Sequence, residues 1–449
     1  MKNNIDIILK GSVFKMVCKL SLPNFLGVSS MPIIIFMDAF FISKLGNIEL
    51  ASLALVFPFL TVMQMMSAGA IGGATTSSIS RHLGKSNFSG ANSAALHAII
   101  IAIVLSLIYS IIFLFFPDYI FTMMGAKGSV LENAIWYAQV SFGGAIFIWL
   151  VYILSAIFRA IGDVITPAIV QIIGCIFQII LAGTLTLGWF GFSSIGIIGP
   201  ALAMVISHFI MMLYLIFNLQ LKQKVIKLTS GSISLSSFKD IMKVGGGGLI
   251  NSITIAGTVA VVTAAVSKHS VEALAGYGLG SRLEIIITPL VFGIGSVLTA
   301  AVGINAGAQQ LHRARMIAWT GAFISFFVVG ILGATVTISP DIWLNNFKSN
   351  ALIKDYATSY LMIVAPFYCF FAAGQTLYFA SQGLGRIFYP VVVGIIRLLL
   401  VSIICFYVTF YDLSLNFVFY GVSFGLLATG LGLWMCMLGP DWKKQIRYI

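Results

Sequence analysis

Two acidic residues of this chain lie inside long apolar stretches, where a carboxylate is available for proton chemistry. Asp38 lies about one turn from the far end of the first apolar stretch, and Glu284 lies within a stretch of the second half. A carboxylate in hydrocarbon is costly, and the usual relief is protonation or burial in a polar cavity. An aspartate so placed can take up and release a proton as its surroundings close and open. The alternative for Asp38 is an interfacial carboxylate paired with Lys44.

Two arginines also lie in apolar stretches. Arg282 precedes Glu284 by two residues, and Arg397 falls at a similar depth in a later stretch. An internal ion pair with either arginine would lower the cost of charging Glu284. We therefore expect a structural pair here, with a direct part in function as the alternative.

A few neutral polar residues in the same stretches are candidates for lining a cavity between helices. Each is equally well explained as an interhelical hydrogen bond that holds a bundle together. They are Asn24, Gln64, Gln178, Asn251 and Gln375. Pro23, next to Asn24, can kink its helix or free a backbone carbonyl, and we count it among the cavity candidates.

The composition requires a solvent other than water. Of the 449 residues, 59% are hydrophobic and only 8% are charged, which is too few to cover the surface of a soluble protein. A lipid bilayer supplies the solvent for the excess apolar surface. The net charge of +12 does not indicate a nucleic-acid partner, because the basic residues lie in short loops rather than on one patch.

No motif indicates an enzyme, a metal site or a cofactor. The five cysteines show no C-x-x-C spacing, and the five histidines are scattered without an H-x-x-x-H pair. The segment GAKGS at residue 125 lacks the spacing of a phosphate-binding loop. We expect free, buried thiols and no catalytic cluster.

Twelve apolar stretches are long enough to cross a membrane as helices, which takes roughly 20 residues. They are far longer than the ~10-residue strands of a membrane barrel. The first is also too long for the apolar core of a signal peptide. The expected spans are 16–42, 50–80, 93–116, 133–158, 165–189 and 195–221 in the first half, and 241–266, 273–303, 316–338, 356–382, 388–411 and 414–438 in the second. The predicted fold class is therefore an all-α integral membrane protein.

The basic residues test this count and orient the chain. Of the 25 Lys and Arg residues, 18 fall in segments on one side of the expected spans, five fall on the other side, and two lie within helices. A wrong number of helices would destroy this bias. Because basic loops stay in the cytoplasm, we expect both termini to be cytoplasmic, in a multi-pass protein of the cell inner (plasma) membrane.

The two halves of the chain repeat at an offset of 223 residues. The segment 154–170, LSAIFRAIGDVITPAIV, aligns with 377–393, LYFASQGLGRIFYPVVV, so that Gly162 meets Gly385. Each half has an even number of helices, so both enter the membrane in the same direction, and a substrate site is expected where they meet. The expected domains are an N-terminal lobe at 1–221, a solvated cytoplasmic linker at 222–240 and a C-terminal lobe at 241–449.

The order and spacing of several motifs resemble those of the multidrug and toxic compound extrusion (MATE) family over about residues 16–440. The motifs are LSLPNFLG, MDAFFISKLGN, SRHLGKSNFSGA and FRAIGDVITP in the first half, and EALAGYGLGSRLE, VGINAGAQQLHRAR and FASQGLGRIFYP in the second. The resemblance implies two pseudo-symmetric six-helix lobes around a V-shaped cleft. It also implies export of cationic or amphipathic compounds in exchange for protons or sodium. Asp38 matches the first-helix aspartate of the family's N-lobe coupling site, and Pro23 matches the proline that bends this helix in some members.

The chain departs from the family pattern around Asp38. Many members carry an asparagine and, four residues later, an aspartate in the fifth helix, where this sequence has Gln178 and Ala182. One helical turn places both positions on the face that meets the first helix. A threonine common in the sixth helix is Met204 here, and the acidic residues that some members carry in helices seven and ten are missing. Fewer oxygen ligands hold a sodium ion less well, so protons are the favoured coupling ion and sodium is the alternative.

The sequence thus predicts a secondary active antiporter that works as a monomer in the bilayer on small-molecule substrates. No cofactor, no nucleic-acid partner and no enzymatic activity are expected. A sodium-coupled exporter of the same family is one alternative. A flippase of lipid-linked precursors, with a similar architecture, is another, although such proteins commonly carry more charge in the central cavity.

Overall fold

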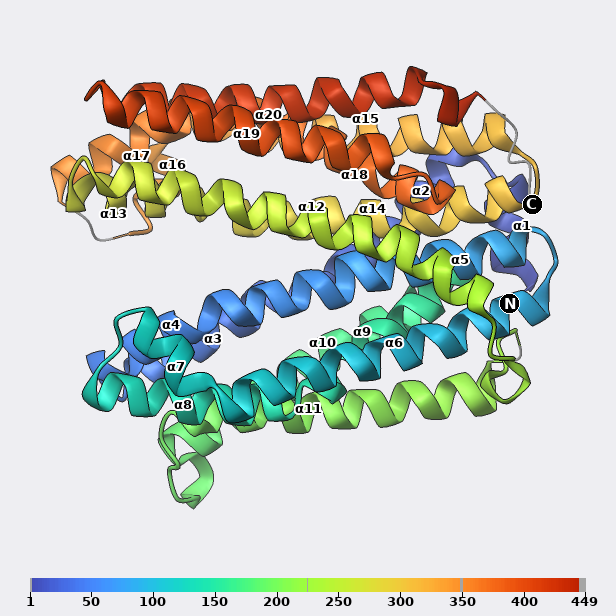
Figure 1. Ribbon diagram of the computed structural model, residues 1–449, viewed down its shortest axis with the longest axis horizontal. Coiled ribbons are helices and arrows are strands. Elements are labelled where there is room, and N and C mark those ends of the chain that lie inside the picture. The colour runs from blue at the N-terminus through green and yellow to red at the C-terminus, as the bar shows by residue number, and fades with distance from the viewer. Residues whose placement is uncertain (1, 224, 348–349, 444–449) are drawn as a thin grey trace. The chain divides into compact units, whose positions relative to one another are not determined.

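The computed structural model describes residues 2–223, 225–347 and 350–443, and every regular element within these ranges is a helix (Figure 1). A helix satisfies its backbone polar groups internally, which hydrocarbon demands of any spanning segment. Eleven helices of the described part are long and apolar enough to cross a membrane. The pair α8 (Gly128–Gly143) and α9 (Ala145–Ala160), bent by 45° at Gly144, makes a twelfth when it is counted as one broken span. The predicted all-helical fold with twelve spans is confirmed.

The spans follow the predicted ranges closely, and several are broken near the middle. In the first half they are α2 (Val13–Val28) with α3 (Ser30–Ser43), α4 (Asn47–Gln64) with η1 (Met65–Ile71) and α5 (Gly72–Gly84), α6 (Phe88–Phe115), the pair α8 and α9, α10 (Ile165–Leu187), and α11 (Ile198–Phe217) with η3 (Asn218–Lys222). In the second half they are α12 (Leu235–Ser267), α13 (Val271–Ser281) with α14 (Glu284–Gly307), α15 (Leu311–Ile338), α17 (Ala351–Val364) with η5 (Ala365–Phe367) and α18 (Tyr368–Leu384), α19 (Phe388–Phe410), and α20 (Leu415–Leu438). Short helices complete the chain: α1 (Lys2–Lys10), α7 (Pro117–Met123), η2 (Trp189–Gly191), η4 (Leu228–Ser230), α16 (Asp341–Leu344) and η6 (Pro440–Trp442).

The chain divides into two compact units. The first unit comprises residues 26–245, and the second comprises residues 2–25 together with the described residues from 246 onward. Two spans therefore change unit along their length. The first span leaves the second unit after Phe25, and α12 leaves the first unit after Gly245, within a run of four glycines.

The internal repeat is visible in the hydrogen bonds inside each unit. Thr76 Oγ1 donates to the carbonyl of Ala156 at 3.1 Å, and Thr299 Oγ1 donates to the carbonyl of Phe379 at 2.9 Å. Donor and acceptor of the second bond each lie 223 residues after those of the first. The same contact between the second and fourth spans of each half is thus made twice, which supports two pseudo-symmetric six-helix halves.

The two glycines that aligned in the sequence end equivalent helices. Gly162 has φ +80° and Gly385 has φ +76°, both in the left-handed region that favours glycine. The amide of Gly162 donates to the carbonyl of Arg159, and that of Gly385 donates to the carbonyl of Gln382, both at 2.9 Å. The shared glycines are therefore required by the turn that follows the fourth and tenth spans.

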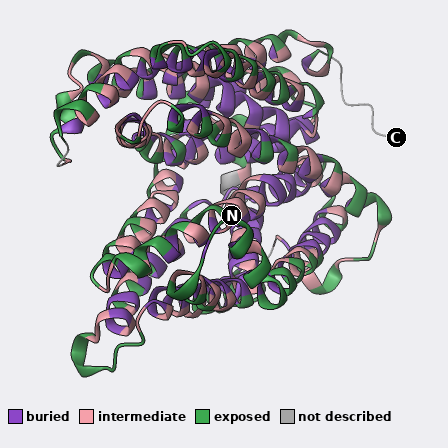
Figure 2. Ribbon diagram, turned by 60° about the vertical axis from the view of Figure 1, so that its left-hand side comes forward, coloured by how far each residue is buried: buried purple, intermediate pink, exposed green. Residues whose placement is uncertain are grey.

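Helix α6 shows how these spans divide their surface. Its alanines at four-residue spacing, Ala94, Ala98 and Ala102, are buried against neighbouring helices. The opposite face carries large exposed apolar side chains: Val104, Leu107, Ile108 and Ile111. Figure 2 shows such exposed positions distributed along the helices and not only in the loops. An exposed apolar face of this length is typical of a helix that lies against lipid.

The segment expected as a solvated linker, 222–240, is docked on the first unit. The amide of Lys227 donates to Asn92 Oδ1 at 2.9 Å, and the amide of Ser234 donates to His97 Nε2 at 3.2 Å. Both acceptors lie on α6. In addition, α12 begins at Leu235, so the end of the expected linker is already helical. The linker thus has two of its backbone amides held by polar side chains of α6, while much of its length is exposed.

The start of α12 is tied to the first unit by an ion pair. Arg81 Nη2 donates to both carboxylate oxygens of Asp240, at 3.0 and 2.9 Å, and Ser78 Oγ donates to the same carboxylate at 2.6 Å. In the second unit, Arg313 donates to the carbonyl of Ile8 in α1 at 3.0 and 3.1 Å. Each unit thus holds the segment that leads into a span which later changes unit.

Replacing either repeat glycine should destabilise the protein. Gly162→Ala or Gly385→Ala forces a Cβ into a left-handed backbone, at about 1 kcal/mol for each substitution. We expect each variant to lower the apparent melting temperature of the full-length protein in detergent. Gly278→Ala is the matched control, since an added Cβ there meets no atom within 4 Å. Melting temperatures equal to that of Gly278→Ala would contradict the role of the positive φ angles.

Candidate functional site

Asp38 is a buried carboxylate on α3. Its side chain is 7% exposed, and its Oδ1 atom has no hydrogen-bond partner. None of the ion pairs found among the described residues includes it. The alternative partner, Lys44, instead places its ammonium group 5.2 Å from the ring centre of Phe40. Asp38 therefore lies in the first unit without the interfacial pairing that the sequence left open.

A second polar group without partners lies on the helix that packs against α3. Gln178 of α10 is completely buried, and neither its Nε2 nor its Oε1 atom has a hydrogen-bond partner. The buried side chains of Tyr137 and Cys175 are close enough to Asp38 for its charge to act on them. Buried polar atoms in proteins are nearly always hydrogen-bonded. Unpaired oxygen and nitrogen atoms from α3 and α10 therefore make this region the best candidate for binding a proton or an ion.

The rest of this region is apolar. Phe41, Ala182 and Ala203 form one buried cluster that joins α3, α10 and α11. Ala182 thus meets α3, one turn after Gln178 on α10, and Met204 is also buried. A hard cation such as sodium needs several oxygen ligands. Ala182 and Met204 supply none, because neither side chain carries an oxygen atom.

Glu284 is held by tyrosines in the second unit. Its Oε1 atom accepts a hydrogen bond from the hydroxyl of Tyr360 at 2.9 Å and from that of Tyr368 at 3.4 Å. The ring of Tyr277 packs edge-on against Tyr360, with centroids 5.4 Å apart. Glu284 begins α14 directly after the break that follows α13, and the two tyrosine donors flank the break between α17 and α18. Two interrupted helices therefore meet around one carboxyl group.

Glu284 forms no ion pair with an arginine among the described residues, so the prediction of such a pair is wrong. Arg282 is exposed, with its guanidinium carbon 5.9 Å from the ring centre of Phe347. Arg282 follows the end of α13 and Glu284 begins α14, so the break between these helices separates the two charges despite their closeness in sequence. The sequence reasoning missed Tyr360 and Tyr368. The two tyrosines lie eight residues apart in one apolar stretch, on either side of Pro366, and this pattern could have identified them.

Asn24 is engaged in the second unit. Its Nδ2 atom donates to the carbonyl of Gly293 at 2.8 Å and to Ser296 Oγ at 2.7 Å. Both acceptors lie on α14, so this amide joins the first span to the eighth. Pro23 precedes it inside α2 and is half-buried.

The remaining predicted residues are divided between the units. Gln64 ends α4 in the first unit, where the chain passes into η1, and it is half-buried. Gln375 on α18, Asn251 on α12 and Arg397 on α19 are buried in the second unit. Arg397 Nη2 donates to Thr254 Oγ1 at 3.3 Å, on the same helix as Asn251. Of the predicted residues, Gln178 thus lies on the helix that packs against that of Asp38, and Asn251 lies on the helix that Arg397 contacts, while the hydrogen bonds of Glu284 come from tyrosines.

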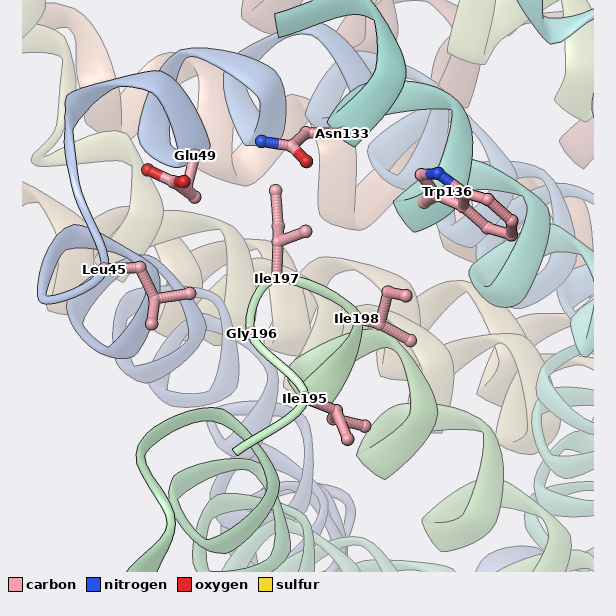
Figure 3. A pocket seen from close by; sticks show the side chains of 8 residues that line it. All are labelled: Leu45, Glu49, Asn133, Trp136, Ile195, Gly196, Ile197 and Ile198. Atoms are coloured by element: carbon pink, nitrogen blue, oxygen red, sulfur yellow. The ribbon is translucent and has the colours of Figure 1, made fainter. Parts of the chain in front are cut away.

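A surface pocket of the first unit lies at the ends of its helices (Figure 3). Side chains from the start of α4, from α8 and from the segment between α10 and α11 surround it. They are Leu45, Glu49, Asn133, Trp136, Ile195, Gly196, Ile197 and Ile198. None of these residues was predicted as a site residue, and the pocket does not include Asp38.

The sequence of the chain matches a known family twice. A family model described as MatE matches residues 23–184 and residues 249–408. The two matched segments fall one in each half of the repeat, and together they cover well over half of the chain.

Individual relatives are similar over much of their length. A FAD transporter of Shewanella oneidensis is 23% identical over 310 residues, which is 69% of this chain and 68% of that protein. The multidrug export protein MepA of Staphylococcus saprophyticus is 29% identical over 64% of each chain. The solved structure of a MOP superfamily transporter from Pyrococcus furiosus has the same fold, with a TM-score of 0.89 over 98% of both chains at 24% identity.

Removing the hydroxyl of Tyr360 should destabilise the second unit. Tyr360→Phe leaves a half-buried carboxyl oxygen of Glu284 without its shorter hydrogen bond, at about 1 kcal/mol. We expect a lower apparent melting temperature in detergent, and a smaller loss for Tyr368→Phe because its bond is longer. Tyr378→Phe is the control, since it removes the hydroxyl of another buried tyrosine of α18. An equal effect of all three substitutions would show that Glu284 does not depend on these donors.

Proposed function

The chain belongs to the MatE family of transporters, and on that premise we propose that it is a secondary active antiporter that exports small organic compounds in exchange for protons. The proposal assigns proton binding to Asp38. It further places the protein in the cell inner membrane as a monomer with both termini in the cytoplasm, in keeping with the bias of basic residues.

The observation that carries this proposal is the unpaired carboxylate of Asp38. The side chain is buried, its Oδ1 atom has no partner, and the apolar cluster around Phe41 lies one turn further along α3. In such surroundings the neutral, protonated carboxyl is favoured over the ion. Opening of the site to water favours release of the proton. A cycle of opening and closing can therefore exchange protons for substrate.

We favour protons over sodium as the coupling ion, because two of the positions that match the family's N-lobe coupling site lack oxygen-bearing ligands. A proton needs a single carboxylate oxygen, whereas sodium needs several oxygens at once. Around Asp38 the helix faces offer Gln178, while Ala182 and Met204 contribute no oxygen-bearing side chain. The proposed coupling ion thus follows from the number of oxygen ligands near Asp38, and not from the charge of Asp38 alone.

The names of relatives support small organic substrates of more than one chemistry. One relative is a FAD transporter and another is a multidrug export protein. The sequence resemblance favours cationic or amphipathic compounds. A sodium-coupled exporter of the same family, and a flippase of lipid-linked precursors, are the other outcomes that a transport assay separates.

Replacing Asp38 should abolish coupling to the pH gradient. The full-length protein is reconstituted in liposomes, and uptake of a fluorescent organic cation is followed under an imposed pH gradient or an imposed sodium gradient. We expect the native protein to respond to the pH gradient alone. Asp38→Asn, which keeps the shape but cannot exchange a proton, should lose at least about tenfold of this uptake, the size expected when a proton-transfer group is removed.

Asp118→Asn is the matched control, since Asp118 is an exposed carboxylate of the same unit. It should leave pH-driven uptake unchanged. Uptake driven only by sodium would favour the sodium-coupled alternative. No uptake by folded protein under either gradient would favour a flippase or another substrate class.

A further inference from the structure

We propose that Arg397, together with Asn251 and Thr254, forms an anion-binding subsite in the second unit, and that it takes the carboxylate or phosphate group of an amphipathic substrate. The proposal rests on the proposed transport function and names a substrate chemistry for it. It concerns a group of residues that the proton-binding role of Asp38 does not use.

Arg397 carries a buried positive charge. The side chain is 3% exposed on α19, and its Nε atom is buried without a hydrogen-bond partner. Its Nη2 atom donates to the neutral hydroxyl of Thr254 at 3.3 Å. The ion pairs found in the described ranges do not include Arg397. A buried guanidinium without a counter-ion is strongly unfavourable, so an anion bound here would be stabilised by the full charge.

Among the described residues, no carboxylate forms an ion pair with Arg397. Glu284, a carboxylate within the spans of the second unit, already accepts hydrogen bonds from Tyr360 and Tyr368. The hydroxyl of Thr254 also donates to the carbonyl of Asn251 at 2.8 Å, so towards Arg397 it acts as an acceptor only. A guanidinium presents five N–H donors in a planar fork that fits a carboxylate or a phosphate. Most of these five donors are therefore available for a ligand from outside the chain.

Glycines also let polar groups of α12 lie close to the helix that carries Arg397. Gly394 precedes Arg397 by three residues and so lies on the same face of α19. A Cβ on Gly394 would lie 3.0 Å from Thr254 Oγ1 and 3.1 Å from Asn251 Oδ1. On α20, a Cβ on Gly425 would lie 3.5 Å from Arg397 Cγ. A side chain at Gly394 would crowd these two polar atoms, whereas glycine lets α19 approach α12 closely and keeps Asn251 and Thr254 beside the helix face that carries Arg397.

The anion can belong to a substrate or to a phospholipid headgroup, because both present oxygens to the fork. A substrate anion makes Arg397 important for the apparent affinity of acidic compounds and unimportant for their uncharged or cationic analogues. A lipid phosphate makes Arg397 important for stabilisation by anionic lipid. The two sources therefore differ in which measurement the residue affects.

The test compares a xanthene dye that carries a free carboxylate with the same dye as its ethyl ester. The full-length protein is reconstituted in vesicles of neutral phospholipid, and uptake of each dye is measured as a function of concentration under a pH gradient. We expect Arg397→Gln to raise the half-saturating concentration of the carboxylate dye by about tenfold or more, as the loss of a charge-assisted hydrogen bond implies. Uptake of the ester should change by less than about twofold. Arg397→Lys, which keeps the charge but not the fork, should fall between.

Arg282→Gln is the matched control, since it removes an exposed arginine of the same unit. It should leave the affinity for both dyes unchanged. Equal half-saturating concentrations of the carboxylate dye for the native protein and Arg397→Gln would overturn the proposal. So would an equal loss for both dyes, which would make Arg397 a structural residue.

A binding measurement separates this proposal from the proposed function. In detergent, the carboxylate dye should raise the melting temperature of the native protein and not that of Arg397→Gln. This shift does not require transport, so native protein that moves neither dye but shows the shift contradicts proton antiport and supports the subsite. If an anionic phospholipid stabilises only the native protein while the carboxylate dye has no effect, the subsite holds a lipid headgroup, and the substrate role is overturned.

Discussion

The cost of a charge in a low-dielectric interior governs this protein more than any other interaction. It explains why the charged residues are few and gather at helix ends, and why each charge that remains inside a unit has a particular arrangement. Glu284 is relieved by two tyrosine hydroxyls, at 2.9 and 3.4 Å. Asp38 and Arg397 keep buried atoms without partners. The first arrangement is that of a satisfied structural group, while the other two are arrangements that a proton or a bound anion would complete.

The same constraint made the fold predictable from the sequence. A helix is the simplest way to satisfy the backbone in hydrocarbon, so the number and ends of the spans follow from apolar length and from basic loops. The repeat was visible because Gly162 and Gly385 must both adopt positive φ angles. Two details were not predictable. The docking of the linker depends on polar side chains of α6, and the passage of the first span and α12 between units depends on packing.

The candidate site was predictable only where one residue carries the signal. A lone carboxylate such as Asp38 stands out in an apolar stretch, and the resemblance to the family singled out Gln178 and Ala182, which helical spacing places on one face. Partners that come from distant segments were not predictable, because helical spacing fixes a face and not its neighbour. Arg282 was expected beside Glu284 and lies instead near Phe347, and Asn24 proved to be bonded to Ser296. The hydrogen bonds of a membrane bundle thus depend on which helices pack together.

Measuring the movement of protons directly tests whether a proton is exchanged for a substrate through Asp38. Full-length protein is reconstituted in sodium-free liposomes that hold a pH-sensitive dye, and an organic substrate is added outside without any imposed pH gradient. We expect entry of the substrate to drive protons out, so that the interior becomes more alkaline for the native protein and not for Asp38→Asn. Substrate entry without a change of internal pH, or an equal change in the variant, would contradict it.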